Sequence, residues 1–253
     1  MNDAAQVAFL KLDVNKIALL LDFDGTLVDI AATPDAVHVP GELCQSLARL
    51  LELTSGALAI VSGRPIADVD ARFAPLKLPV VGGHGAEMRI RDDEIVSAVT
   101  ALPDDLRRRL KAAEAFDPGV LIEDKGYSVA LHYRRAPVVA DRLRAHIEAV
   151  CADFPGEPME MLPGKALFEI KRPGVSKGEG VRALLTHAPF AGRTPVFIGD
   201  DETDKTLFAL LPEFGGIGFS VDLEFEGLAG VFESPAAVRA ALKRLALDGA
   251  AGR

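Results

Sequence analysis

The stretch from Ile17 to Leu27, IALLLDFDGTL, constrains this chain more than any other. Its first five residues are apolar and uncharged, which predicts a short strand buried on both faces. Two carboxylates, Asp22 and Asp24, end the strand, and at this spacing their side chains leave on the same side. Ligands of an open parallel sheet bind beyond the carboxyl ends of its strands. Taken alone, the stretch fits a two-acid site and an ordinary Asp-Gly turn equally well.

Further strands and helices alternate after this first strand. Apolar runs at 57–61, 79–81, 195–198 and 216–221 predict buried strands, and leucines and valines at helical spacing predict helices between them. Strand–helix–strand units with right-handed crossovers build a parallel sheet. We therefore expect an α/β fold with a Rossmann-like, doubly wound parallel-sheet core.

Residues 102–171 break this alternation. The pattern there reads helix, strand, strand, and then helix, strand, strand again. Such an order is typical of an α+β domain rather than of a parallel sheet. We expect an inserted α+β domain at 102–171, within a parallel-sheet domain formed by 1–101 and 172–253.

The charge and the apolar pattern argue against several partners. The chain has 28 basic and 37 acidic residues, a formal net charge of −9, which disfavours nucleic acid and anionic membrane surfaces. No apolar run approaches the roughly 20 residues of a membrane span, and residues 1–16 lack a signal-peptide pattern. The two cysteines, Cys44 and Cys151, have no metal-site or redox spacing. We expect a cytoplasmic monomer that binds neither nucleic acid nor a membrane.

Polar residues also follow other predicted strands. Ser62 follows the second strand, Lys177 begins a helix, and Asp200 follows a later strand. Because parallel strands end at one edge of a sheet, we expect these residues to lie near Asp22 and Asp24. Singly, each has an ordinary explanation, such as a solvated lysine or a helix N-cap. Together, they favour a functional site.

These residue types suit phosphoryl transfer. Carboxylates without a histidine or thiolate partner are ligands for magnesium rather than zinc. A lysine and a hydroxyl can hold phosphoryl oxygens, and the transfer depends mainly on positioning and charge stabilisation. One carboxylate can attack phosphorus, while its neighbour gives a proton to the leaving alkoxide and later takes one from water. The residues alone do not decide which carboxylate has which task.

Four motifs, in this order, resemble those of the haloacid dehalogenase superfamily of phosphotransferases. They are DFDGTL at 22–27, SGR at 62–64, KG at 177–178 and GDDETD at 199–204. The resemblance implies that Asp22 is the nucleophile and Asp24 the general acid and base, with Ser62 and Lys177 completing the catalytic set. It also implies a metal site for Mg²⁺, held by Asp22, Asp200 and the carbonyl of Asp24, with Asp204 in support.

Within that superfamily, other segments resemble the trehalose-6-phosphate phosphatase family. They are GHGAE at 83–87, EDKGYS at 123–128, HYR at 132–134, and GK at 164–165 leading to Glu169. The resemblance implies hydrolysis of trehalose 6-phosphate to trehalose and phosphate through an aspartyl-phosphate intermediate, under a mobile cap that closes over the sugar. The substrate-binding residues it implies are Gly63, Arg64 and His84 in the core and Glu123, Lys125, Arg134, Lys165 and Glu169 in the cap.

Other activities fit the same core. A different cap surface would select sucrose 6-phosphate, mannosyl-3-phosphoglycerate or a hexose phosphate, and a phosphomutase would keep its intermediate from water. An inactive sugar-phosphate-sensing module would be expected to have lost Asp22, Asp24, Lys177 or Asp200, and all four are present. The last motif departs from the family in continuing with Lys-Thr at 205–206, where more acidic residues are expected.

Overall fold

The computed structural model of the protein describes residues 4–31, 36–91, 94–97, 100–164 and 166–251. The chain divides into two compact units. The first, called the core below, consists of Met1–Ala98 and Ser176–Arg253, and the second, called the cap, of Val99–Val175. The predicted insert, 102–171, falls inside the second unit.

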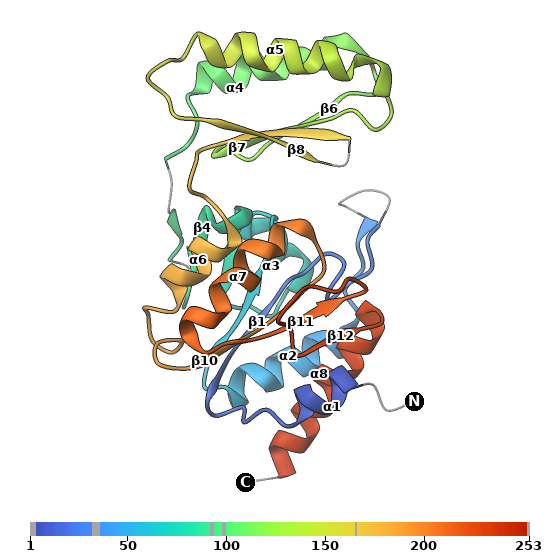
Figure 1. The fold of residues 1–253 in the computed structure, drawn as a ribbon, viewed down its shortest axis with the longest axis vertical. Coiled ribbons are helices and arrows are strands. Elements are labelled where there is room, and N and C mark those ends of the chain that lie inside the picture. The colour runs from blue at the N-terminus through green and yellow to red at the C-terminus, as the bar shows by residue number, and fades with distance from the viewer. Residues whose placement is uncertain (1–3, 32–35, 92–93, 98–99, 165, 252–253) are drawn as a thin grey trace. The chain divides into compact units, whose positions relative to one another are not determined.

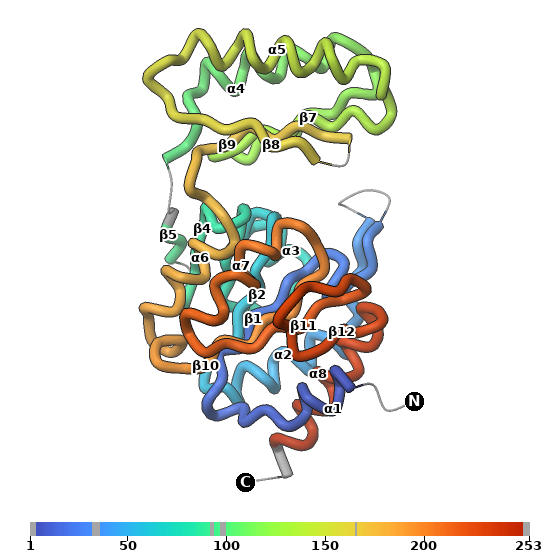
Figure 2. Tube along the Cα trace, viewed as in Figure 1, coloured from blue at the N-terminus to red at the C-terminus, as the bar shows by residue number. Residues whose placement is uncertain are grey.

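The core is built on one mostly parallel sheet, in which β1 lies between β10 and β2 (Figures 1 and 2). Within the described residues the sheet has eight strands, in the spatial order β12 (Gly230–Phe232), β11 (Ile217–Val221), β10 (Thr194–Gly199), β1 (Ile17–Leu21), β2 (Leu58–Val61), β3 (Val80–Gly82), β4 (Glu87–Arg89) and β5 (Val96–Ser97). Neighbours from β12 to β3 are parallel, whereas β4 is antiparallel to β3 and to β5. The predicted α/β fold is confirmed.

Strand β1 shows why helices must cover both faces of this sheet. All five of its residues are buried. Leu19 and Leu21 belong to one hydrophobic cluster, and Leu20 belongs to the other, as alternation along a strand requires. The first cluster includes side chains of α1 (Ala4–Leu10), α2 (Gly41–Leu53), α3 (Ile66–Phe73) and α8 (Pro235–Ala251), and the second those of α6 (Lys177–Leu184) and α7 (Lys205–Leu210).

The strand register brings the polar residues together at one edge. Leu21 lies opposite Ile198 of β10 and Ile60 of β2. The next residue, Asp22, donates its backbone N–H to the carbonyl of Ile198 at 2.9 Å. Chain segments that follow β1, β2 and β10 therefore emerge side by side, as expected for parallel strands.

The cap is a four-stranded antiparallel sheet with helices on one face. Its spatial order is β6 (Leu121–Asp124), β7 (Ser128–His132), β9 (Leu167–Lys171) and β8 (Glu160–Gly164). The covering elements are α4 (Asp104–Lys111) with the 3₁₀ turn η3 (Ala112–Phe116), and η4 (Pro137–Val139) with α5 (Ala140–Ala152). Leu131 and Phe168 pack among the apolar residues of these helices. This is the helix–strand–strand order that the sequence predicts, and within the described residues of this unit both helices pack on the same face of the sheet.

Four elements of the core were not predicted from the sequence: α1, β4, β5 and β12. The three strands have two or three residues each, too few for a period of two to be recognised. Strand β4 also contains a buried charge, because Arg89 is paired with both carboxylate oxygens of Asp70 at 2.6 Å. A buried arginine hides a strand from a search for apolar runs.

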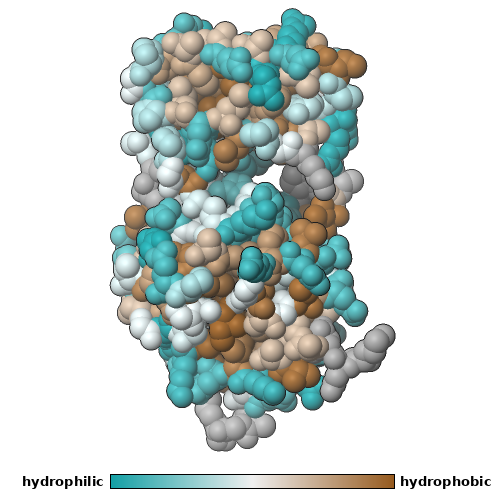
Figure 3. All heavy atoms as spheres, viewed as in Figure 1, coloured by the Kyte–Doolittle hydropathy of each residue, from teal (hydrophilic) through white to brown (hydrophobic). Residues whose placement is uncertain are grey.

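The surface mixes polar and apolar residues. On the face in Figure 3, hydrophilic and hydrophobic residues are interspersed over both units, which is ordinary for a water-exposed surface. Among the described residues, we find no helix with the length and hydropathy needed to cross a membrane.

Candidate active site

Asp22, the first residue after β1, is a buried carboxylate held by a buried lysine. The Nζ of Lys177 lies 2.6 Å from Oδ1 of Asp22 and 2.8 Å from Oδ1 of Asp204. Lys177 is the first residue of α6, whose start is fixed by Ser176, a cap that accepts the N–H of Glu179 at 3.1 Å. Burial alone would lower the pKa of Lys177, but the charges of Asp22 and Asp204 raise it above its usual value. Lys177 is therefore a permanent cation inside the protein.

One lysine does not balance the acidic groups around it. Burial raises the pKa of Asp22 well above its usual value against the attraction of Lys177, and the charges of Asp204 and Asp200 raise it further. Burial also raises the pKa of Asp200 to about 6. Oxygens of Asp22, Asp200 and Asp204 lie within 4.8 Å of one another. The cluster thus has three carboxylates and Lys177 as their neighbouring cation, and its donors are the hard oxygens that divalent cations such as Mg²⁺ accept.

Gly25 and Thr26, which continue the first motif after Asp24, both lie against the carboxylate of Asp200. Gly25 has a φ of +86°, and a β-carbon there would lie 2.1 Å from Oδ2 of Asp200. No other residue type leaves room for the Asp200 carboxylate. Thr26 donates its hydroxyl to Oδ1 of Asp200 at 2.9 Å. Together they fix Asp200 beside the end of β1.

Asp204 holds the backbone of the acidic loop at 200–204 in place. One of its oxygens accepts from Lys177, and the other accepts the backbone N–H groups of Asp200 at 2.8 Å and Asp201 at 3.1 Å. Asp201 in turn accepts the N–H of Thr203 at 2.9 Å. Asp204 is completely buried. It thus links the lysine to the backbone that presents Asp200.

The carboxylate of Asp24 points to an arginine. Arg64 donates from Nε to Oδ2 of Asp24 at 2.6 Å and from Nη2 to Oδ1 at 2.8 Å. Its third nitrogen, Nη1, donates to Asp68 on α3 at 2.5 Å. The two carboxylates raise the pKa of Arg64 against the effect of its burial. Asp22 and Asp24 therefore have different partners: a lysine and neighbouring acids for one, a bidentate arginine for the other.

Ser62 and His84 lie next to this arginine. The hydroxyl of Ser62 accepts the N–H of Arg64 at 3.1 Å, and its carbonyl accepts the N–H of His84 at 3.0 Å. A β-carbon on Gly63 would lie 2.4 Å from Nε2 of His84, so Gly63 is needed for the imidazole to pack there. Burial raises the pKa of Asp201, but the charge of Lys177 lowers it, and the charge of His84 lowers it further. The net result is a pKa below the usual value. His84 is thus at the border of the acidic cluster.

The residues at 205–206 have structural tasks. Lys205 is paired with Glu202 at 2.7 Å on the surface. Thr206 accepts the N–H of Gly178 at 3.3 Å and donates to the carbonyl of Thr203 at 3.1 Å. Thr206 therefore joins the start of α7 to α6 at Gly178.

In the cap, three of the predicted sugar-binding residues meet on the face of the sheet opposite the helices. The Nζ of Lys125 lies 3.9 Å from Oε2 of Glu123 and 3.7 Å from Oε1 of Glu169. The register places both glutamates beside the small residue Ala130 of β7. Arg134 is exposed and lies two residues beyond the end of β7. Lys165 lies outside the described residues.

The comparisons with known proteins identify the family. The chain matches the family model described as trehalose-phosphatase over residues 20–225. This chain belongs to the trehalose-phosphatase family. It is 40% identical over 208 residues to the trehalose-6-phosphate phosphatase of Escherichia coli (strain K12), covering 81% of this chain and 77% of that protein. It is also 40% identical over 241 residues to a probable trehalose-phosphate phosphatase of Sinorhizobium fredii, covering 94% and 91%.

Solved structures share the fold. A trehalose-6-phosphate phosphatase related protein superposes with a TM-score of 0.76 at 24% identity, covering 94% of this chain and 100% of that chain. The C-terminal domain of the C. albicans trehalose-6-phosphate phosphatase superposes with a TM-score of 0.74 at 23% identity, covering 97% of each. The resemblance seen in the motifs is therefore confirmed at the level of the family and the fold.

For this trehalose-phosphatase family member, sequence reasoning missed residues that act through others. Thr26 and Asp68 carry no signal apart from their places beside motifs, and Gly25 needs its positive φ and the nearness of Asp200 to be understood. Ser128, in the EDKGYS segment, donates its hydroxyl to Oε1 of Glu169 at 2.9 Å. A pairing between side chains far apart in sequence leaves no pattern that a single sequence reveals.

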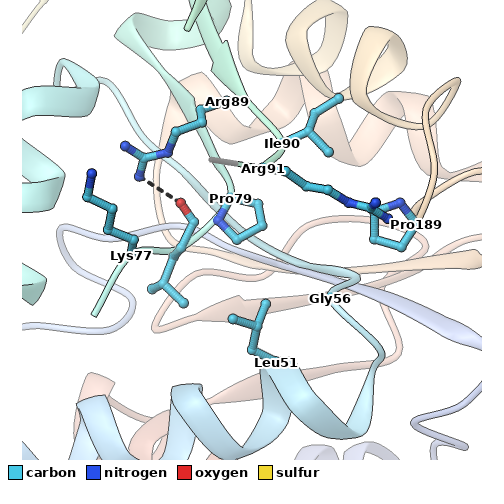
Figure 4. A pocket seen from close by; sticks show the side chains of 9 residues that line it. Leu51, Gly56, Lys77, Pro79, Arg89, Ile90, Arg91 and Pro189 are labelled. Atoms are coloured by element: carbon cyan, nitrogen blue, oxygen red, sulfur yellow. Dashed lines mark hydrogen bonds between the residues drawn. The ribbon is translucent and has the colours of Figure 1, made fainter. Parts of the chain in front are cut away.

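A separate cavity of about 290 Å³ lies elsewhere in the core (Figure 4). Lys77 and Pro79, which precede β3, and Gly56, which precedes β2, help to line it, so it is at the edge where the parallel strands begin, away from Asp22. The guanidinium of Arg89 faces the carbonyl of Leu78, to which it donates at 2.8 Å (Figure 4). Since Arg89 also holds Asp70, its place in this cavity is explained by the packing of β4.

Proposed function

We propose that this protein hydrolyses trehalose 6-phosphate to trehalose and phosphate, with Mg²⁺ and an aspartyl-phosphate intermediate on Asp22. The observation that carries the proposal is the buried Asp22 carboxylate, which is held by Lys177 at 2.6 Å and grouped with Asp200 and Asp204. Membership of the trehalose-phosphatase family supports the substrate. Free thiols at Cys44 and Cys151 support the proposal of a cytoplasmic location. We also propose that the protein acts as a monomer.

The acidic cluster fits a magnesium ion. Its donors are carboxylate oxygens. Burial, and to a smaller extent the neighbouring carboxylates, raise the pKa values of Asp22 and Asp200, and a bound cation would offset both effects. We assign Asp22 and Asp200 as ligands, together with the Asp24 carbonyl. Asp204 supports them, because hydrogen bonds from Lys177 and from two backbone N–H groups already engage its two oxygens. Bound Mg²⁺ would neutralise charge on the phosphoryl oxygens and favour the ionised form of Asp22.

In the first step, a carboxylate oxygen of Asp22 forms a bond to phosphorus while the bond from phosphorus to the sugar oxygen breaks. Lys177 keeps the Asp22 carboxylate in place, since its Nζ holds Asp22 and Asp204 together. The hydroxyl of Ser62 and the Lys177 ammonium are the groups that hold oxygens of the transferring phosphoryl group. Most of the rate gain in such a transfer comes from this positioning and charge balance.

Asp24 moves the protons. It donates one to the departing sugar oxygen and then removes one from the water that attacks phosphorus and frees Asp22. The bidentate pair with Arg64 occupies both carboxylate oxygens of Asp24. Asp24 must therefore leave Arg64, at least in part, to carry a proton in the first step. Arg64 keeps it ready for the second step, in which it acts as the base.

The cap face with Glu123, Lys125 and Glu169 is the part proposed to recognise the sugar. Polar groups that converge on one place can bond several hydroxyls of a disaccharide at once. Sucrose 6-phosphate, mannosyl-3-phosphoglycerate and glucose 6-phosphate remain as alternative substrates. The relatives named above favour trehalose 6-phosphate.

A substrate panel tests this function. Phosphate release is measured for trehalose 6-phosphate and for the three alternatives, with Mg²⁺ and with EDTA. We expect trehalose 6-phosphate to have the highest kcat/KM and all turnover to stop in EDTA. A kcat/KM for glucose 6-phosphate equal to that for trehalose 6-phosphate would rule out the disaccharide assignment, and full activity in EDTA would rule out the metal.

A further inference from the structure

The polar groups on the open face of the cap sheet form one connected chain. The strand register places Glu123, Ala130 and Glu169 side by side in a row across β6, β7 and β9. Lys125 reaches over this row to one oxygen of each glutamate, at 3.9 and 3.7 Å. Both distances exceed a hydrogen bond, so Lys125 alone does not fix either carboxylate.

A further residue contacts each of these two glutamate oxygens. His132 approaches Oε2 of Glu123 with its Nε2 at 3.4 Å, and Ser128 donates its hydroxyl to Oε1 of Glu169 at 2.9 Å. The contact of Ser128 has the length of a normal hydrogen bond, and that of His132 is longer. Ser128 and Glu169 are diagonal neighbours on one face of β7 and β9, because Ala130 lies directly opposite Glu169. Ser128 therefore makes the shorter of these two contacts.

Ser128 is placed to support Glu169 and not to touch a ligand. Its side chain is buried, with a relative exposure of 2%. The residue opposite it on β9, Lys171, does not compete for Glu169, because its Nζ is paired with Glu160 at 3.1 Å and also donates to the carbonyl of Val175. The Ser128 hydroxyl thus holds the partly buried carboxylate of Glu169 in one orientation.

We propose that Ser128 is a positioning residue for sugar recognition, which orients Glu169 through its hydroxyl. This inference rests on the proposed role of the cap face. A carboxylate that is already oriented loses less conformational freedom when it binds a hydroxyl, so its hydrogen bond contributes more to affinity. Loss of the Ser128 hydroxyl removes the 2.9 Å hydrogen bond to Oε1 of Glu169, so the carboxylate is held less firmly in its orientation. The loss appears in the binding of the sugar and not in the chemistry at Asp22.

The test compares Ser128→Ala with a matched control, Ser46→Ala. Ser46 is also buried, but it lies on α2 of the core and donates to the backbone carbonyl of Glu42. We expect Ser128→Ala to raise KM for trehalose 6-phosphate about fivefold to tenfold, which lies within the range for the net loss of one ordinary hydrogen bond. Its kcat, and its kcat/KM for p-nitrophenyl phosphate, stay within twofold of the wild type. Ser46→Ala is expected to leave kcat and KM for both substrates unchanged.

Three further variants separate positioning from folding. Ser128→Thr retains the hydroxyl and is expected to restore the wild-type KM. Ser128→Cys retains the shape with a weak donor and is expected to behave like Ser128→Ala. In a Glu169→Gln background, Ser128→Ala is expected to add less than a twofold effect, because its partner is already altered.

The proposal is overturned if Ser128→Ala and Ser128→Cys leave KM unchanged, if they reduce activity on both substrates equally, or if the full effect persists in the Glu169→Gln background. Failure of the proposed function looks different, since the wild-type enzyme itself would then not prefer trehalose 6-phosphate. In that case the same KM ratio is measured on the sugar phosphate of the panel that the wild type prefers, and it decides the role of Ser128 there.

Discussion

Replacing Lys177 by Met tests the charge balance of the core site most severely. Met has nearly the same length and no charge, so the substitution removes the cation and keeps most of the volume. It leaves the buried carboxylates of Asp22 and Asp204 without the ammonium that lies 2.6 and 2.8 Å from them. Removing one partner of a buried ion pair costs about 3–5 kcal/mol, because a charge stays buried without compensation.

This cost can be measured as a loss of thermal stability. For a chain of this size, about 1 kcal/mol corresponds to about 2–4 °C in Tm, so Lys177→Met is expected to lower Tm by about 6–20 °C in EDTA at pH 8. The loss becomes smaller at pH 5, since burial already raises the pKa of Asp22 and its protonation then removes the uncompensated charge. Mg²⁺ is expected to restore part of the stability by supplying positive charge. Turnover falls by at least about 10²-fold, as for loss of one charge-stabilising group.

The control is Lys243→Met, which removes an exposed lysine paired with Glu42 on the surface. It is expected to change stability by less than about 0.5 kcal/mol. Differential scanning fluorimetry at both pH values, with and without Mg²⁺, gives the comparison. A difference in Tm of 2 °C corresponds to roughly 0.5–1 kcal/mol. If Lys177→Met melts within about 2 °C of the Lys243→Met protein in EDTA at pH 8, the buried ion pair does not stabilise the core as argued.

Three other predictions follow from the site. Gly25→Ala is expected to weaken Mg²⁺ activation, because its β-carbon would lie 2.1 Å from Asp200. The control is Gly192→Ala, at a similar φ of +77° with nothing within 4 Å, which should affect stability alone. Equal Mg²⁺ titrations of the two variants would contradict this. In EDTA, stability is expected to fall as pH rises from about 4 through 6, since the folded state retains the proton of Asp200, whose pKa is raised to about 6; urea unfolding across this range should lose that slope when Mg²⁺ is added. Lys125→Ala should reduce kcat/KM for trehalose 6-phosphate at least about tenfold more than for p-nitrophenyl phosphate, which is the scale of a lost hydrogen bond to a charged group. The control, Lys111→Ala, changes an exposed lysine of the cap and should leave kcat/KM for both substrates unchanged. Equal losses on both substrates in Lys125→Ala would place the defect in the core.

The sequence predicts the fold well where burial leaves a clear pattern. Five uncharged residues before Asp22 form β1, buried on both faces, and the strand ends at Ser62 and Asp200 lie at the same edge because the parallel register requires it. The short strand β4 escaped prediction because its buried Arg89 depends on Asp70 of another element. Local pattern thus predicts elements whose stability comes from their own apolar face.

The site was predictable as a set of residue types and not as a set of pairings. The acidic cluster was expected from its motifs, and the structure brings Asp22, Asp200 and Asp204 together. The bidentate hold of Arg64 on Asp24 was not expected, because it joins residues 40 positions apart. Such contacts depend on side-chain rotamers and on the packing of α3, and a local sequence pattern reveals neither.

The most direct test of the account is to trap the phosphorylated enzyme. In Asp24→Asn, the group that activates water is lost, while p-nitrophenolate is a leaving group good enough to depart without a proton from Asp24. With p-nitrophenyl phosphate and Mg²⁺, we expect a burst of one equivalent of p-nitrophenolate and then a stall, and mass spectrometry of the quenched protein should find one phosphoryl group on Asp22. Steady turnover without a burst, or a phosphoryl group on any other residue, would contradict the assignment of Asp22 as the nucleophile.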